Sequence, residues 1–170
     1  VIAAIADQQG INIREIGPIV IEASDPDLDS TLAFSVASSD YNVAHPNRIR
    51  FVITEEGKRH LYIVPNRDNT GATTITVTVS DGEFEAEASF TLTTREAERY
   101  SLDLAQSDGG VISVTPPSDT FVEESVATIN ALPAKGYIFE GWTGALEGTE
   151  TPVTLMMGAD KNVGAKFSNP

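Results

Sequence analysis

The chain has 170 residues and a formal net charge of −14, from 25 acidic residues against 11 Lys and Arg. Such a surface repels polyanions, which excludes nucleic acid as a partner and disfavours an anionic membrane. The sequence has no apolar stretch long enough for membrane insertion and no cysteine, which excludes disulfides, thiolate metal sites and cysteine nucleophiles.

The first half of the chain is a series of short β-type runs separated by turn signals, without a segment of helical periodicity. The expected strands are Ile2–Ala6 with Ile11–Ile13, Ile19–Ala23, Leu32–Val36, Ile49–Ile53, Leu61–Val64, Thr73–Ser80 and Phe84–Thr94. About seven strands at this spacing are typical of an all-β sandwich of the immunoglobulin or cadherin type.

The clearest alternation lies in TTITVTVSDG, residues 73–82. Ile75, Val77 and Val79 share one face of the expected strand, and the next residue of the same parity is Asp81. One explanation is that Asp81-Gly82 is an ordinary turn pair. The other is that the strand delivers a carboxylate to one end of the domain, where a cation binds.

A polar segment, TTREAERYS, interrupts this alternation at residues 93–101. It predicts a first domain at 1–94, a linker at 95–99 and a second module at 100–170. The charge divides almost evenly, with −8 for residues 1–94 and −6 for residues 95–170. The alternative is one short helical turn inside a single domain.

The second half continues as short β candidates closed by Gly, Pro or Asp. Its start predicts a hairpin, in which the turn at residues 108–110 joins Leu102 and Leu104 to Ile112 and Val114. A module of about 70 residues is near the lower limit for independent folding, so its few large residues must be central to its core.

Trp142 is the single tryptophan of the chain. In one interpretation it is an exposed platform of a sugar-binding module. In the favoured one it packs with Tyr137, Phe139 and Phe167 in the core, because the module has few other large residues.

Two resemblances add to this interpretation. Residues 1–94 resemble the bacterial cadherin-like and Ig-like tandem modules in IADQ, GPIVIEASDPDLD, LAFSVASSD, LYIVPNRDNTGATTITVTVSDG and SFTLTT. Residues 100–167 resemble the divergent internalin B-repeat family in YSLDL, GGVISVTPP, INALPAKGYIFEGWTGALEG and PVTLMMGADKNVGAKF. The resemblances imply a seven-stranded sandwich followed by a small β-rich, β-grasp-like domain, both non-catalytic.

The segment ASDPDLD places three acids two residues apart, so alternate carboxylates of an extended chain point the same way. The resemblance to cadherin-like modules implies Asp25, Asp27 and Asp81 as ligands of a weakly bound Ca²⁺, with Glu15 as the glutamate of the first loop. Carboxylate oxygens are ligands that Ca²⁺ prefers. The alternative is a solvated turn whose shape is fixed by Pro26.

The sequence contains few candidates for catalytic residues. His45 precedes Pro46 in an expected loop, and His60 begins an expected strand with its side chain toward solvent. Neither histidine belongs to a metal-binding or nucleophile–base motif, and the chain has no G-x-S-x-G or H-E-x-x-H. The sequence therefore predicts a protein without catalytic residues.

We expect non-catalytic structural or adhesion modules of a large bacterial cell-surface or secreted protein, which space or present other domains and are stiffened by calcium. The expected partners are neighbouring modules of the parent chain and a protein or glycan ligand. The alternative is a carbohydrate-binding accessory region of a secreted polysaccharide-degrading enzyme. An exposed aromatic row on one sheet face would favour that alternative.

Overall fold

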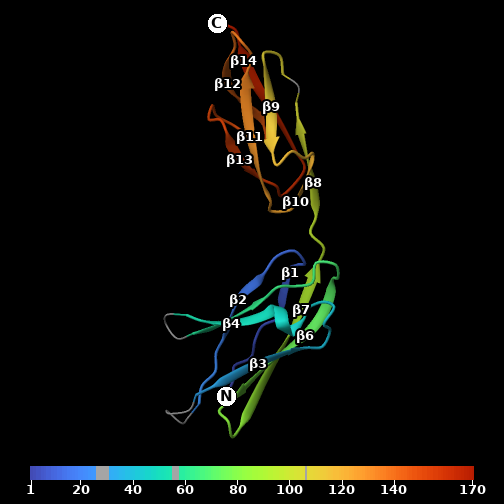
Figure 1. Ribbon diagram of the computed structural model, residues 1–170, viewed down its shortest axis with the longest axis vertical. Coiled ribbons are helices and arrows are strands. Elements are labelled where there is room, and N and C mark those ends of the chain that lie inside the picture. Colours follow the sequence, from blue (N-terminus) through green and yellow to red (C-terminus); the bar gives the residue numbers. More distant parts are fainter. Residues whose placement is uncertain (26–30, 55–57, 106) are drawn as a thin grey trace. The chain divides into compact units, whose positions relative to one another are not determined.

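The computed structural model describes residues 1–25, 31–54, 58–105 and 107–170. The chain forms two compact units, Val1–Ala97 and Glu98–Pro170, each built from two β-sheets (Figure 1). A single turn of 3₁₀ helix, η1 (Pro46–Arg48), is the only helix among the described residues. The predicted all-β class is confirmed. The boundary between the units falls after Ala97, inside the segment predicted as the linker.

Unit 1 is a sandwich of a four-stranded sheet, in the order β1-β7-β6-β3, and a three-stranded sheet, in the order β2-β5-β4. The neighbouring strands are antiparallel, except that β1 runs parallel to β7. The strands are β1 (Gln8–Ile11), β2 (Ile16–Ile21), β3 (Ala33–Ser38), β4 (Ile49–Ile53), β5 (Arg59–Ile63), β6 (Gly71–Ser80) and β7 (Glu85–Arg95).

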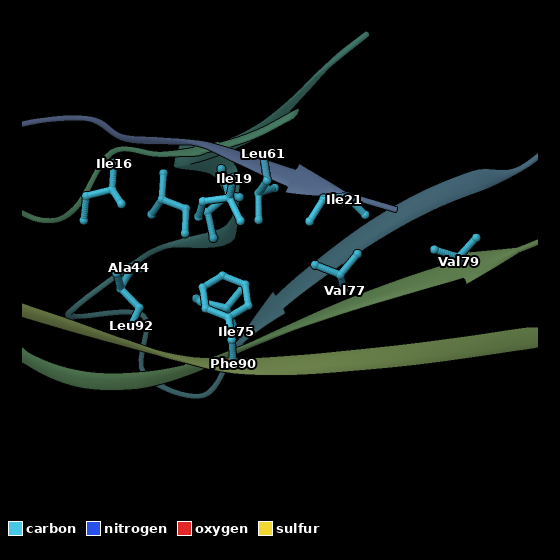
Figure 2. Packing of buried hydrophobic residues seen from close by; sticks show 12 residues of the cluster. Ile16, Ile19, Ile21, Ala44, Leu61, Ile75, Val77, Val79, Phe90 and Leu92 are labelled. Atoms are coloured by element: carbon cyan, nitrogen blue, oxygen red, sulfur yellow. The ribbon is translucent and has the colours of Figure 1, made fainter. Parts of the chain in front are cut away.

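The alternation of residues 73–80 determines how β6 sits in unit 1. Ile75, Val77 and Val79 point into the space between the sheets and are 0%, 0% and 4% exposed. Ile19 and Leu61 face them from the other sheet (Figure 2). Burying a side chain of this size stabilises the fold by about 1.5–3 kcal/mol, so the period-2 pattern fixes which face of β6 is inside.

The start of the chain differs from the expected strand at Ile2–Ala6. Only one bridge forms there, Ile2↔Ala23, next to β2. The chain then crosses to the other sheet, where β1 begins at Gln8 and pairs with β7. A segment that changes sheets cannot keep one continuous ladder, so the single expected strand becomes a bridge and a short strand.

Unit 2 consists of a four-stranded sheet, in the order β10-β8-β14-β12, and a three-stranded sheet, in the order β13-β11-β9. Its strands are β8 (Arg99–Leu104), β9 (Gly110–Thr115), β10 (Thr120–Val122), β11 (Val126–Pro133), β12 (Ile138–Gly144), β13 (Val153–Met156) and β14 (Lys161–Ser168). The described residues of unit 2 contain no helix. A second sheet, rather than a helix, thus covers the first in this β-rich module.

The predicted hairpin at residues 102–114 is wrong. The strand β8 pairs with β10 and β14, whereas β9 pairs with β11 in the other sheet. Leu102 and Ile112 belong to one apolar cluster. They reach it from opposite sheets, so the turn at residues 108–110 carries the chain across the core instead of reversing it within one sheet.

The predicted core position of Trp142 is confirmed, because its side chain is 6% exposed and belongs to the buried cluster of unit 2, with Phe139 and Phe167 packed against that cluster. Tyr137, the third expected partner, is not among the residues of the cluster. The rings of Phe139 and Trp142 lie 4.9 Å apart in an edge-on arrangement, and those of Phe139 and Phe167 lie 5.7 Å apart. The indole N–H of Trp142 donates a hydrogen bond of 2.7 Å to the carbonyl of Glu150. The buried polar atom of the ring is therefore satisfied.

Candidate functional site

Asp25 and Asp81 meet at one pole of unit 1. Asp25 follows the end of β2, and Asp81 follows the end of β6. Their carboxyl groups lie within interaction distance, and the contact with Asp25 helps to lower the pKa of Asp81. Two carboxylates this close repel each other when both are ionised. The third acid implied by the resemblance, Asp27, lies outside the described residues.

Asp81 also shapes the turn between β6 and β7. Its Oδ1 accepts hydrogen bonds from the backbone N–H groups of Phe84, at 2.6 Å, and Glu83, at 2.7 Å. These two bonds are the main reason that the pKa of Asp81 lies below its ordinary value of 3.8, and the contact with Asp25 lowers it further. Gly82 supplies the positive φ, 98°, that this turn needs. The inward row of β6 thus ends in an acid that builds a turn.

The described donors form only part of a calcium site. Ca²⁺ takes six to eight oxygen ligands in proteins. Asp25 and Asp81 contribute two carboxyl groups, and Oδ1 of Asp81 already accepts two backbone hydrogen bonds. Within the part of the chain that the structure describes, no group of three or more His, Cys, Asp or Glu side chains is placed to hold a metal ion.

The role implied for Glu15 is wrong. Glu15 precedes β2 and Asp25 follows it, so the six residues of Ile16–Ile21 separate them. At 3.2–3.4 Å per residue, this strand puts the two carboxylates roughly 20 Å apart, at opposite poles. Glu15 instead accepts hydrogen bonds of 2.9 and 3.0 Å from the guanidinium of Arg50. The glutamate is engaged in a surface ion pair.

Sequence reasoning missed the cation at the pole of Asp25. Arg59 starts β5 opposite Ile21, the last residue of β2. Its guanidinium lies 4.1 Å from the centre of the Phe34 ring and donates a hydrogen bond of 3.4 Å to the carbonyl of Leu32. Arg59 lies on the same face of β5 as the buried residues Leu61 and Ile63. An arginine in an otherwise apolar row was the sequence signal that could have revealed this cation.

A surface hollow of about 1100 Å³ lies at the same pole. Apolar and basic side chains line it together, among them Val20, Leu32, Phe34, Lys58, Arg59 and His60. The lining holds a single carboxylate, Glu22, and not the pair that glycoside hydrolysis requires. It also contains Ser24, Thr31 and His60, but no hydrogen bond among the described residues joins either hydroxyl to the imidazole as in a nucleophile with its base. Among the described residues, the hollow therefore offers no catalytic constellation.

The two histidines have structural surroundings. His45 caps η1, since its Nδ1 accepts a hydrogen bond of 3.2 Å from the backbone N–H of Asn47. Its ring lies 5.1 Å from that of Tyr41. His60 stands on the outer face of β5, with its ring 6.5 Å from that of Tyr62. Neither arrangement resembles a catalytic base held by an orienting carboxylate.

Comparison with known families agrees with this geometry. Residues 100–169 match the model of the divergent InlB B-repeat domain, and residues 2–94 match the model of the bacterial Ig domain. The searches of curated proteins and of solved structures found no match. The order of the two modules is the one predicted from the sequence. Because the second match covers more than half of the 170 residues, the chain belongs to the bacterial Ig domain family.

Proposed function

We propose that the chain is a pair of non-catalytic modules that space or present neighbouring domains of a large bacterial cell-surface or secreted protein. The observation that carries the proposal is two β-units in series, each with its own buried cluster. Ig-like and B-repeat modules are typical of surface and secreted proteins. In the described residues, no helix is both long and apolar enough to cross a membrane.

The described aromatic side chains favour spacing over sugar binding. Tyr41 and Phe84 are the large exposed ones, at 58% and 68%. Tyr41 lies between β3 and η1, and Phe84 lies in the turn between β6 and β7, so they form no row on a sheet face. Trp142 is buried. A stacking platform for a polysaccharide needs exposed rings side by side, and these residues do not provide one.

The spacing proposal is tested by display on a bacterial surface. The chain is placed between a membrane anchor and a peptide epitope, and antibody binding to the epitope is measured. We expect accessibility to fall when unit 2 is deleted and to recover when an unrelated folded domain of equal length replaces it. Accessibility that does not change would contradict spacing. Retardation of the chain in polysaccharide gels would support the carbohydrate alternative instead.

We also propose that Asp25 and Asp81 bind Ca²⁺ weakly, with Asp27 as a third ligand. The contact between the first two carboxyl groups supports this, because it brings them within reach of one ion. A divalent cation would remove the repulsion between the two ionised carboxylates. We expect a Kd of roughly 10⁻⁴ to 10⁻³ M, as in extracellular modules with few protein ligands.

Thermal unfolding tests the calcium proposal. Millimolar Ca²⁺ should raise the Tm of unit 1 by several degrees relative to chelator, because the ion binds only the folded state. Asp25→Asn and Asp81→Asn should each abolish the shift. Asp68→Asn is the matched control, since Asp68 is an exposed aspartate in the loop between β5 and β6. An unchanged wild-type Tm, or an equal shift with Asp81→Asn, would refute the site.

A further inference from the structure

One of the two outer faces of unit 2 carries no charge. In the sheet β13-β11-β9, every second residue points away from the core, because alternate side chains of a strand point to opposite faces (Figure 1). The inward residues Ile112, Ile129 and Leu155 belong to the buried cluster or pack against it. The outward residues are Val111, Ser113 and Thr115 on β9, Val126, Thr128, Asn130 and Leu132 on β11, and Thr154 and Met156 on β13. We call this set the neutral face.

The lack of charge distinguishes this face from the rest of unit 2. The strands of the other sheet expose charged side chains, which are Arg99, Asp103, Glu140 and Lys166. The chain as a whole has a net charge of −14. Burying a charge without a counter-charge is costly, so the neutral face fits a partner surface that is also uncharged.

Exposed apolar side chains lie at both ends of the neutral face. At one end Val126 pairs directly with Met156, and at the other end Leu132 pairs directly with Val111. Val126 is 50% exposed, and the other three are each 64% exposed. Among the described residues of unit 2, Ile138 is the only other large apolar side chain of comparable exposure. Side chains that touch across neighbouring strands form an apolar patch, and exposed patches of this kind mark interaction sites.

The order of outward residues along β11 is the same in both directions. Val126 and Leu132 form apolar ends, and the outward positions between them are polar. Thr128 pairs with Thr115 on one side and with Thr154 on the other, so the polar middle crosses all three strands. A second copy turned end over end therefore presents apolar ends to apolar ends and a polar middle to a polar middle.

A two-fold axis that lies in the plane of contact, across the strands, relates two such copies. Sheets that pack face to face keep their strands within about 30° of each other. With the second copy antiparallel, the Val126 end of one copy lies over the Leu132 end of the other, and the same contact forms at the opposite end. Such a contact uses the same patch on both copies, which is the arrangement of most homodimers.

We propose that the neutral face is a self-association surface, through which unit 2 of one chain binds unit 2 of a second copy. Three strands about 4.8 Å apart, with a rise of about 3.3 Å for each of the 8 residues of β11, give a face of about 14 by 26 Å. This area, roughly 400 Å² per copy, is smaller than the roughly 800 Å² that each partner buries in a stable complex. The contact between a single pair of chains is therefore weak.

The proposed function supplies the setting in which a weak contact is sufficient. Chains displayed on one surface, or on two facing surfaces, bring many copies together, and multivalency raises the overall affinity without new contacts. The inference rests on the proposed function only for this crowding, because the neutral face is a property of unit 2 alone. Surfaces that carry the chain would adhere to one another through it.

Sedimentation equilibrium of the whole chain tests the proposal. At concentrations up to about 1 mM, the Kd of a weak contact, the average mass should rise from that of one chain toward that of two. The negative charge of each chain opposes association, and salt screens this repulsion, so the mass should rise further in about 1 M NaCl than in about 0.1 M. A chain that stays monomeric under both conditions would overturn the proposal.

Two charge variants locate the contact. Leu132→Glu and Val126→Lys should each weaken association about tenfold or more, because each places a charge against an apolar end of the second copy. Both side chains are at least half exposed, so the melting transition of unit 2 should be retained. Asn162→Glu is the matched control, since Asn162 is exposed on β14 in the other sheet and the substitution adds the same charge. Association that is equally strong with Leu132→Glu and with the control would overturn the proposal.

A mixture of the two variants tests the antiparallel arrangement. In a pair formed by Leu132→Glu and Val126→Lys chains, the introduced carboxylate faces the introduced ammonium group at one end, and the other end is unchanged. The mixture should therefore associate at least as strongly as the wild type, whereas each variant alone should not. A mixture of Asn162→Glu with Val126→Lys should show no such recovery. Failure of the first mixture to associate would overturn the proposed arrangement, and misfolded variants could not produce its recovery.

The outcomes separate self-association from the other possibilities. Retention in a neutral polysaccharide gel that Leu132→Glu abolishes, in a chain that stays monomeric, would assign the neutral face to a glycan and overturn the proposal. If the display experiment fails while the mixture associates, spacing is wrong and the self-association surface stands. If display succeeds and the chain is monomeric, self-association is wrong and spacing stands.

Discussion

Replacement of Trp142 by alanine should destabilise unit 2 severely. Emptying a large aromatic site in a core costs about 3–5 kcal/mol. The ring is 6% exposed, packs edge-on against Phe139, and satisfies the carbonyl of Glu150 through its N–H. A domain of about 70 residues has a total stability of about 4–11 kcal/mol. The substitution therefore removes a large share of that stability.

The measurement is differential scanning calorimetry of the whole chain, in which unit 1 serves as an internal reference. In a domain of this size, 1 kcal/mol corresponds to about 4–8 °C, so the transition of unit 2 should fall by more than about 12 °C. Trp142→Phe keeps an aromatic ring beside Phe139 but loses the N–H donor. Its transition should lie between those of the wild type and the alanine variant.

Leu132→Ala is the control, because Leu132 lies on the outer face of β11 and is 64% exposed. It should change stability by no more than about 0.5 kcal/mol. If Trp142→Ala left the transition of unit 2 in place, the core assignment would be refuted. A variant with unchanged melting that had lost retention on a polysaccharide would support the sugar-binding interpretation of this residue.

Two further predictions concern unit 1. Expressed alone, Val1–Ala97 should unfold cooperatively at the Tm that it has in the whole chain, because it has its own buried cluster. A unit 1 that folds only when unit 2 is present would contradict this. The pKa of Asp81 is lowered chiefly by the N–H of Phe84, so its contribution to stability is present above pH 3.8 and is lost as pH falls through the lower folded pKa. In calcium-free urea titrations, the deficit of Asp81→Asn at pH 7 should therefore shrink below pH 3.8, and a deficit independent of pH would refute the assignment.

The strands were predictable where burial and alternation agree. Ile49–Ile53 was expected and observed with the same bounds, and Thr73–Ser80 was two residues short of β6. In these segments a shift by one residue would turn an apolar row toward water, so local sequence determines the face.

Leu102 and Ile112 were assigned to the correct kind of element but to the wrong pairing. Both face the same core, and alternation cannot tell a hairpin from a crossing between sheets.

The site was harder to predict because an aspartate has several roles at a strand end. Asp81 was expected either to form a turn or to bind a cation, and the structure shows it forming the turn while it is in contact with Asp25. The role of Glu15 was wrongly predicted because the resemblance implied a glutamate in the first loop but not the end of the sandwich at which that glutamate lies. The side chain of Arg50, which binds Glu15, is 35 residues away in sequence. No local pattern reports such a contact.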